Sequence, residues 1–398
     1  MSTLGIIVTI AAFAAIIVFH EFGHFVIAKL ARIPVYEFAL GFGRPVLLAF
    51  KWHGTQYSLR PVPVGGFVRI AGMEPDEDVP NGFDKKSTIT RVGVIAAGAG
   101  MNFVLAIIIF WIMGLVFGSV TGVTSRIARV LPNTPAATAG LQPGDVLVSA
   151  TAVAAEASPL AVRTVPAPAH PMKLEALRAA ILSHPDQPIE LIAKRGKSYL
   201  ALRIVPAAEK QQELRPVGGR PLEPDLLTGF LRRLGVVVPT GKSRLVTTTV
   251  GRVGVVFTDV RKPNGLVKSV RDGFVGVYET TSALVGALLG TLLGRLPAAV
   301  GGPVQVGEMM TESFSLGWSQ FLWLAAFISV NIGVINLLPI PALDGSRIVF
   351  LVIEGIRRRP LDRRKEAIVH LVGFALLLVL LALVTFKDIV QIVSKHNG

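Results

Sequence analysis

The chain has no cysteine among its 398 residues. Disulfide bonds, iron–sulfur clusters, cysteine nucleophiles and thiolate zinc sites are therefore excluded, and any metal must be held by His, Asp or Glu. Charged residues are also scarce, at 17% against the roughly 25% of a typical soluble domain. With 51% hydrophobic residues, the chain has ample apolar surface to bury. This composition excludes a disordered protein and argues against a wholly soluble one.

Negative charge is the rarer sign, with 26 Asp and Glu against 40 Lys and Arg, which gives a net charge of +14. In so hydrophobic a chain this surplus fits anionic lipid better than nucleic acid. We therefore expect a lipid bilayer as a partner and no nucleic acid.

Four segments are long and apolar enough for transmembrane helices, which need roughly 20 apolar residues. They are residues 4–30, the uncharged runs between Arg91 and Arg126 and between Glu312 and Asp344, and residues 367–386. A fifth uncharged stretch, 280–294, is too short for a confident span and predicts an interfacial or re-entrant helix. A signal peptide is an alternative for the first segment. However, no basic residues precede it, and it contains ionisable residues where a signal peptide would be uniformly apolar.

Basic residues predict the orientation of these segments. Arg and Lys cluster at positions 347, 357–359 and 363–365, between the third and fourth segments. The positive-inside rule places this loop in the cytoplasm. Loop 31–90 is then also cytoplasmic, and both termini and region 121–273 lie outside.

The long region after the second segment predicts a small β-rich domain. Short β-like runs flank a helical pattern at 174–182, and a turn-rich motif covers Pro135 to Leu141 and continues as Gln-Pro-Gly-Asp145. This motif resembles that of a PDZ domain of the bacterial protease type; an unrelated small β domain is the alternative. An Ala- and Pro-rich stretch at 152–171 looks inserted. Residues 208–249 predict a linker or irregular extension, and 251–257 one more strand.

The cytoplasmic loop carries its own β pattern. Residues 56–70 alternate strand-like runs with Pro61, Pro63, Gly65 and Gly66. They predict a membrane-associated β-hairpin or short sheet. We therefore expect four regions: 1–119 with two transmembrane helices and this hairpin, 120–207 as the PDZ-like domain, 208–275 as a linker or extension, and 276–398 with the interfacial helix and the last two transmembrane helices.

The first apolar segment contains His20-Glu21-Phe22-Gly23-His24. On a helix, positions i and i+4 share a face, so the two imidazoles can bind one zinc ion with Glu21 beside it as general base. A pair of packed helix histidines is the alternative. It is weakened because ionisable groups within a membrane span are costly and are usually functional.

Two histidines leave the metal short of a protein ligand, and without cysteine a carboxylate must supply the third. Asp344 is the best candidate, since it ends the third apolar segment on the same predicted side as His20 and His24. By itself, its Asp-Gly pair would be typical of an ordinary turn. Together with the histidine motif it indicates a zinc site, with one Zn²⁺ per chain.

His20–His24 and the run from Asn336 to Gly345 (NLLPIPALDG) together resemble the site-2 protease family of intramembrane zinc metalloproteases. The PDZ-like domain matches the bacterial branch that cleaves anti-sigma factors, and the run from Gly98 to Asn102, the run from Pro63 to Phe67 and Gly302-Pro303 match further family features. The resemblance implies a polytopic α-helical protein of about four transmembrane helices in the bacterial plasma membrane. A single PDZ motif is a departure, since some relatives carry two.

The resemblance also implies a mechanism and a substrate class. His20, His24 and Asp344 would hold zinc, Glu21 would move the proton, and Asn336, with Asn331, would hydrogen-bond the substrate backbone. Asn331 could equally make a helix–helix hydrogen bond. Gly98 and Gly100 are expected to permit close helix packing rather than chemistry.

Substrates would be single-span membrane proteins already trimmed by a first protease, cut within or near the span. Because the substrate helix must unwind, the hairpin with Gly65, Gly66 and Phe67 is a candidate edge strand that accepts the unwound segment. Three alternatives share some of these features: a zinc protease that clears signal-peptide remnants, a catalytically silent membrane scaffold, and a zinc transporter. The intact Glu21 argues against the scaffold, and the few ionisable residues in the other spans argue against the transporter.

Overall fold

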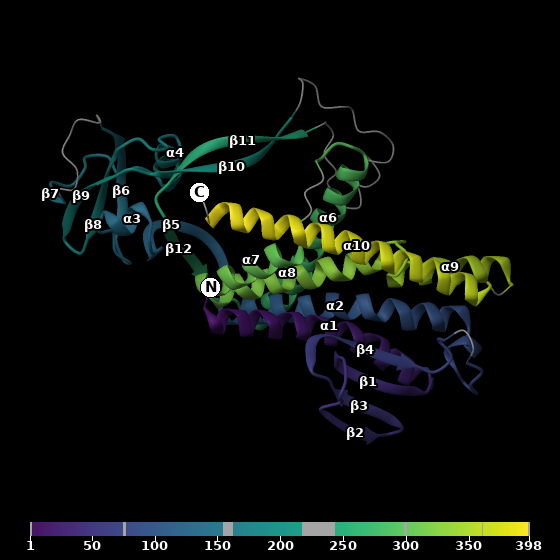
Figure 1. Cartoon of the computed structure of the whole chain (residues 1–398). Coiled ribbons are helices and arrows are strands. Elements are labelled where there is room, and N and C mark those ends of the chain that lie inside the picture. Colours follow the sequence, from purple (N-terminus) through teal and green to yellow (C-terminus); the bar gives the residue numbers. More distant parts are fainter. Residues whose placement is uncertain are drawn as a thin grey trace.

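The computed structural model describes residues 2–74, 77–153, 162–216, 243–297, 301–359 and 361–396. A bundle of long helices forms the middle of the molecule, one β-sheet lies along the first helix, and a second, larger β domain lies beyond one end of the bundle (Figure 1). The bundle helices are α1 (Thr3–Leu30), α2 (Thr88–Val116), α6 (Leu266–Leu292), α7 (Pro303–Leu316), α8 (Trp318–Leu337), α9 (Asp344–Arg357) and α10 (Arg363–His396).

Helix α2 is the central helix and packs against α1, α6, α8 and α9. Its approach to α1 is close because Gly23 faces the backbone of α2. A Cβ at Gly23 would lie 2.6 Å from the carbonyl carbon of Ala97 and 3.0 Å from the nitrogen of Gly98. Small residues at this crossing therefore bring α1 and α2 nearly into backbone contact.

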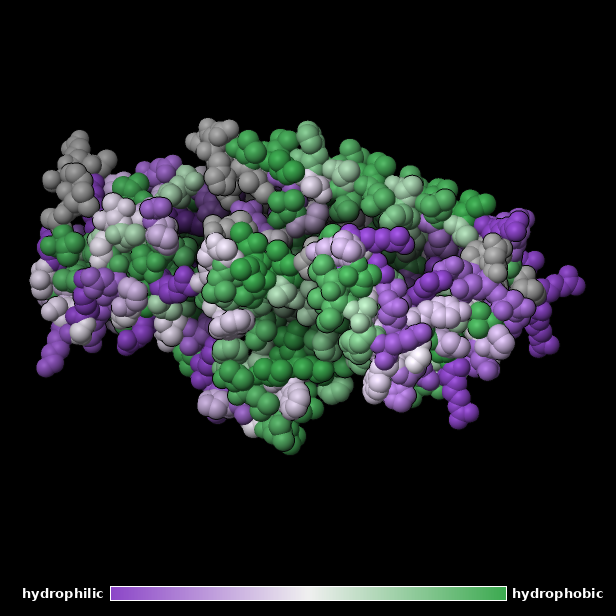
Figure 2. Space-filling model, turned by 60° about the horizontal axis from the view of Figure 1, so that its bottom comes forward, coloured by the Kyte–Doolittle hydropathy of each residue, from purple (hydrophilic) through white to green (hydrophobic). Residues whose placement is uncertain are grey.

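Five of these helices are long and apolar enough to cross a membrane: α1, α2, α6, α8 and α10. Apolar side chains gather across the middle of the molecule, and hydrophilic ones collect most strongly at its right-hand end (Figure 2). Stretch 280–294, expected to be a separate interfacial or re-entrant helix, instead forms the C-terminal part of the 27-residue α6. The sequence concealed this helix because its first half carries Arg271, Asp272 and Glu279.

Helices α6 and α8 both begin at the end of the bundle where α2 finishes. Ser269 in α6 lies against Gly114 of α2, and Ser319 in α8 accepts a hydrogen bond from Arg261 at 3.0 Å, just before α6. The chain that leaves this end along α6 has therefore returned to it by the start of α8. We infer that α6 and the shorter α7 together form an excursion into the bundle and back.

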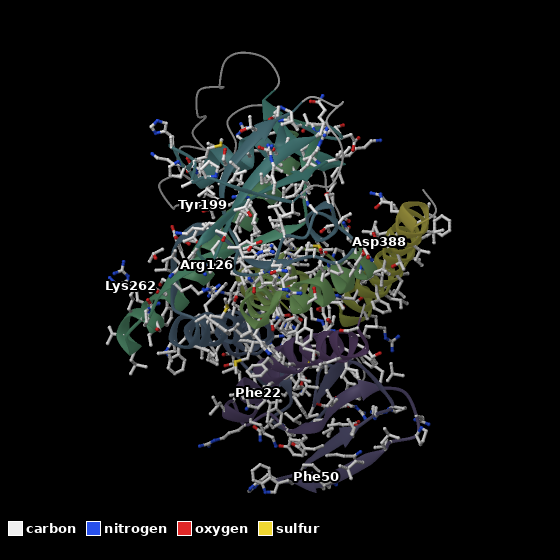
Figure 3. The ribbon with its side chains drawn as sticks, turned by 90° about the vertical axis from the view of Figure 1, so that its left-hand side faces the viewer. Phe22, Phe50, Arg126, Tyr199, Lys262 and Asp388 are labelled. Atoms are coloured by element: carbon white, nitrogen blue, oxygen red, sulfur yellow. The ribbon has the colours of Figure 1, made fainter. Side chains whose placement is uncertain are left out.

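Helix α10 lies at the edge of the bundle, with most of its apolar side chains exposed. The Asp388 carboxylate, buried on α10 (Figure 3), accepts hydrogen bonds from the backbone N–H groups of Gly302 and Gln305, at 3.3 and 3.0 Å. It thus caps the N-terminus of α7, where free N–H groups favour an anion. This polar contact ties the edge helix to the bundle.

The sheet beside α1 consists of β1 (Val35–Phe42), β2 (Leu48–Trp52), β3 (Thr55–Leu59) and β4 (Val62–Ile70) in the order β2-β3-β1-β4. The predicted hairpin at 56–70 is wrong, because its two strands, β3 and β4, do not pair with each other and β1 lies between them. The alternative of a short sheet is correct, although the sequence analysis missed β1 and β2. Phe22 of α1 packs against Phe38 of β1 at a ring distance of 6.5 Å, while Phe50 lies at the far end of the sheet, remote from the helices (Figure 3). Strand β4 is an edge strand and lies against α1.

The larger β domain has a six-stranded sheet in the order β12-β5-β6-β8-β9-β7. Inside its core, Asp145 is only 1% exposed and receives two hydrogen bonds from Arg195, at 2.8 and 2.7 Å, and one from the Gln142 backbone at 2.9 Å. The turn motif around Asp145 is thus fixed by an ion pair between this buried carboxylate and the partly exposed Arg195. The elements of this domain are β5 (Ser119–Val130), α3 (Pro135–Thr138), β6 (Val146–Ala152), β7 (Arg163–Val165), α4 (Leu174–Leu182), β8 (Ile189–Arg195), β9 (Ser198–Ile204) and β12 (Val255–Lys262).

Strand β12 lies beyond the boundary expected at residue 207 and nonetheless pairs along β5. The region expected to be an irregular linker contains a two-stranded antiparallel ribbon, β10 (Ala207–Pro216) with β11 (Ser243–Arg252). The expected strand at 251–257 is the end of β11 and the start of β12, separated at Gly254, whose φ is +81°. Residues 217–242 and part of the insertion expected at 152–171, namely 154–161, lie outside the described residues.

Candidate functional site

His20 and His24 lie one turn apart on the face of α1 that meets α2. Both are buried, with exposed fractions of 9% and 7%. Their Nε2 atoms lie 3.3 Å apart and their rings are nearly perpendicular, with centroids 4.9 Å apart. The i, i+4 spacing thus converges the two imidazoles on one point, as the sequence predicts.

Asp344, the first residue of α9, reaches this point from a helix that packs against α2 and α8. Its Oδ2 atom lies 3.1 Å from His20 Nε2 and 3.3 Å from His24 Nε2. Glycine at position 345 makes the approach possible, because a Cβ there would collide with the carbonyl oxygens that end α8. One ligand atom of each residue therefore falls within 4.8 Å of the others, although 320 positions separate Asp344 from His24.

The spacing of these three atoms fits zinc. Nitrogen and oxygen ligands about 2.0–2.1 Å from a tetrahedral zinc lie about 3.3 Å from one another. The buried Asp344 Oδ2 has no hydrogen-bond partner among the described residues. His24 Nδ1 lies 2.9 Å from the carbonyl oxygen of Val94, which accepts its proton and leaves the Nε2 lone pair free for a metal. The donor set matches the His and carboxylate ligands of catalytic zinc sites.

Glu21 lies beside this cluster and is not one of its members. The backbone of Val68 in β4 hydrogen-bonds its carboxyl group, and a Cβ at Gly66 would stand 3.7 Å from its Cγ. Glu21 therefore lies between the two histidines and the edge strand. This position suits a group that carries a proton between the three-residue cluster and the edge of β4.

Gly98 on α2 packs directly against the imidazole rings of His20 and His24. A Cβ at this position would overlap the His24 ring at Nε2 and Cε1 and would stand 2.9 Å from His20 Cε1. The expectation of close helix packing is thus correct for Gly98, which packs on the imidazoles themselves. It is wrong for Gly100, where an added Cβ would meet nothing within 4 Å.

Asn102 is a site residue that the sequence analysis did not assign. It is fully buried, and its side-chain nitrogen lies 3.4 Å from His20 Nδ1 while its Oδ1 has no partner among the described residues. With its amide turned by half a rotation, Asn102 would accept the Nδ1 proton of His20 at Oδ1 and leave His20 Nε2 free for the metal. The sequence did offer a signal for Asn102, because it is an amide within an otherwise apolar run. In the structure its backbone carbonyl accepts a hydrogen bond from Ser329 of α8 at 2.8 Å.

The expected substrate-binding residues Gly65, Gly66 and Phe67 all lie on β4. The Phe67 ring stacks on Phe42 at 6.2 Å, and the Arg60 guanidinium lies 5.1 Å from its centroid. Arg60 in turn pairs with Glu37 at 2.8 Å. Burial opposes ionisation of Glu37, but hydrogen bonds from Ser58 and Arg60 outweigh it and lower the pKa of this carboxyl. A charged and aromatic cluster thus holds β4 on β1 and leaves its other edge facing α1 and Glu21.

Asn331 and Asn336 lie in the last two turns of α8, before the loop that ends at Asp344. Both are partly buried, and neither makes a hydrogen bond to another described residue. The alternative of a helix–helix hydrogen bond from Asn331 is therefore not observed in the described part of the chain. Ser329 makes such a bond instead, and both amides are free for another partner.

Comparison with known proteins gives a family match over most of the chain. Peptidase family M50 matches residues 8–380. A protein of Clostridium perfringens named "Putative zinc metalloprotease CPE1693" is 33% identical over 97% of this chain and 98% of its own length. Zinc metalloprotease RasP of Bacillus licheniformis is 28% identical, and regulator of sigma-W protease RasP of Bacillus subtilis 27% identical, each over 96% of this chain and 98% of its own length. With five membrane-capable helices around a zinc-compatible cluster, the chain belongs to peptidase family M50, the site-2 protease family of zinc metalloproteases, and its cofactor is zinc.

Proposed function

We propose that this protein is an intramembrane protease that cuts single-span membrane proteins within or near their transmembrane segments. The observation that carries the proposal is the position of His20, His24 and Asp344, which converge inside a bundle of apolar helices beside a strand edge. A soluble peptide would not need a site in this position. The name of the Bacillus subtilis relative connects that relative to control of a sigma factor, which supports anti-sigma-factor-like substrates and regulated intramembrane proteolysis here.

The zinc ligands are His20, His24 and Asp344. Zinc held there would polarise the scissile carbonyl and lower the pKa of a water towards about 7. The Glu21 carboxylate would take a proton from the attacking water and later give it to the leaving amine, which departs uncharged. Gly98 and Asn102 keep the two imidazoles in place, so the side chains need little rearrangement during the reaction.

Strand β4 receives the unwound substrate by β-addition, and Asn336 and Asn331 supply side-chain amides to its backbone. The edge position of β4 and its contact with Glu21 support this assignment. The natural absence of cysteine gives a clean test. We expect Phe67→Cys in the Glu21→Gln background to form a disulfide with a cysteine near the scissile bond of a substrate. Leu48→Cys, on the far edge of the sheet, should not, and equal cross-linking at both positions would contradict the assignment.

The zinc site lies near the cytoplasmic face of a bacterial plasma membrane, and the six-stranded domain and both termini lie outside. The basic loop between α9 and α10 supports this orientation. Alkaline phosphatase fused in the six-stranded domain after His170 should be active, and a fusion after Arg358 should be inactive. The opposite pattern would reverse the proposed topology.

The six-stranded domain is PDZ-like and controls access by bulk, so that substrates already trimmed by a first protease enter. Purified protein in liposomes should cut a single-span substrate with a short ectodomain and leave the untrimmed form intact.

Chelation should stop cleavage, and added Zn²⁺ should restore it. Mapping the new termini by mass spectrometry tests the site of attack. Cuts confined to soluble segments, or cleavage that survives chelation, would contradict the proposed function.

A further inference from the structure

The loop that carries Asp344 is held from outside by α10. His370 Nδ1 lies 3.1 Å from the backbone nitrogen of Ala342 and accepts its hydrogen bond. Since Nδ1 is the acceptor, the proton of a neutral imidazole is on Nε2, which lies 3.8 Å from Glu366 Oε1 one turn earlier. The His370 side chain is only 13% exposed and stands edge-on to the Phe350 ring of α9, with centroids 5.9 Å apart.

The loop needs such a support because its backbone is unusual at the point of contact. Ala342, two residues before Asp344, has a φ of +78°, in the left-handed region that side chains other than glycine avoid. Conformations of this kind persist only where the surroundings determine them. Hydrogen bonds inside the loop join Ile340 to Leu338 and Leu343 to Ile340, while the N–H of Ala342 is given to His370.

A second contact fixes the distance between α10 and the loop. Gly373 lies one turn after His370, and a Cβ there would overlap the Pro341 side chain and stand 2.8 Å from its carbonyl carbon. On the other side, Gly345 packs against the carbonyl oxygens that end α8. The loop is therefore clamped between α8 and α10 on both flanks of Asp344.

We propose that His370 is a positioning residue for the third zinc ligand, holding Ala342 in its left-handed conformation and thereby aiming the Asp344 carboxylate at the two histidines. This inference rests on the proposed role of Asp344. The positioning role explains why the apolar edge helix α10 carries His370, because ionisable residues in a membrane are costly and are usually functional. His370 touches neither the metal nor the substrate and acts through the loop backbone.

Zinc affinity of the purified full-length protein, measured by competition with a fluorescent chelator, tests the proposal. We expect His370→Leu to lower zinc affinity about 10-fold, at the lower end of the 10–100-fold effect of residues that orient metal ligands. His370→Asn keeps an acceptor at the δ position and should stay within about 3-fold of the natural protein. His370→Gln, whose oxygen reaches one carbon further, should resemble the Leu variant. Gly373→Ala should also weaken binding, because the new methyl group pushes Pro341.

Val372→Ala is the matched control, since Val372 is 53% exposed on the same helix and should leave zinc affinity unchanged. Equal affinity of the Leu and Asn variants would overturn the proposal, as would unchanged affinity in Gly373→Ala. If the Leu variant does not fold, the Asn and Gln variants decide. Asp344→Ala separates the two levels of the argument: retention of zinc by this variant refutes Asp344 as a ligand, whereas its loss together with normal affinity of His370→Leu refutes only the positioning role.

Discussion

Glu21→Gln should keep its full complement of zinc while losing cleavage by about 10²–10⁴-fold, the usual contribution of a general base. The expectation follows from geometry, because Glu21 stands beside the His20, His24 and Asp344 cluster and is not part of it. An amide has nearly the shape of the carboxyl group but cannot take a proton from water. Metal analysis and a cleavage assay on the same preparation give both quantities.

Glu279→Gln is the control, since Glu279 is an exposed residue of α6 and its neutralisation should change neither quantity. Near-normal turnover of Glu21→Gln would mean that another group carries the proton. Loss of zinc from Glu21→Gln would mean instead that Glu21 is a ligand, and the division of roles proposed here would be wrong.

Gly98→Ala should abolish cleavage and lower zinc affinity by at least about 10-fold, as expected when the orientation of metal ligands is disturbed. The added methyl group would occupy the space of His24 Nε2, a predicted ligand atom. Helix propensity alone predicts that Gly98→Ala makes the fold more stable, since Ala is favoured over Gly in a helix by about 0.5–1 kcal/mol. A folded protein that has lost zinc would therefore identify displacement of the imidazoles as the cause.

Gly100→Ala is a closely matched control, two residues away on the same helix and with open space where its Cβ would lie. We expect it to bind zinc and cleave substrate normally. If both variants retain zinc, α1 and α2 can separate enough to accept a methyl group, and the cluster is less tightly packed than the structure indicates. Chelator competition on the two variants makes this comparison directly.

The sequence predicted the parts of the site that depend on local spacing. His20, Glu21 and His24 lie within one turn of helix, so their neighbourhood follows from helical geometry alone. Asp344 was reached by elimination, because a chain without cysteine needs a carboxylate to complete the ligand set. Gly98 and Asn102 depend on how α2 lies against α1, and a crossing between two helices leaves no local pattern in either.

The fold followed the same division. Uncharged runs predicted α1, α2, α8 and α10, whereas α6 was taken for a short helix because its first half is charged. The sheet beside α1 was underestimated for another reason. Strand β1 pairs parallel to β3 and antiparallel to β4. Whether residues 35–42 join this sheet therefore depends on contacts with residues distant in the sequence. The left-handed conformation of Ala342 has no sequence signal, because alanine does not favour it and the surrounding contacts impose it.

The two polar contacts that α10 makes with the rest of the protein lie far apart along the helix. His370 and Asp388 are 18 residues apart, which corresponds to about 27 Å along a helix. The hydrocarbon layer of a typical bilayer is about 30 Å thick. A helix with an apolar band of this size, and with a polar anchor at each border, has a preferred depth in the lipid. The acyl-chain length of the surrounding lipids would therefore affect the depth of the helix whose His370 holds the loop before the third zinc ligand.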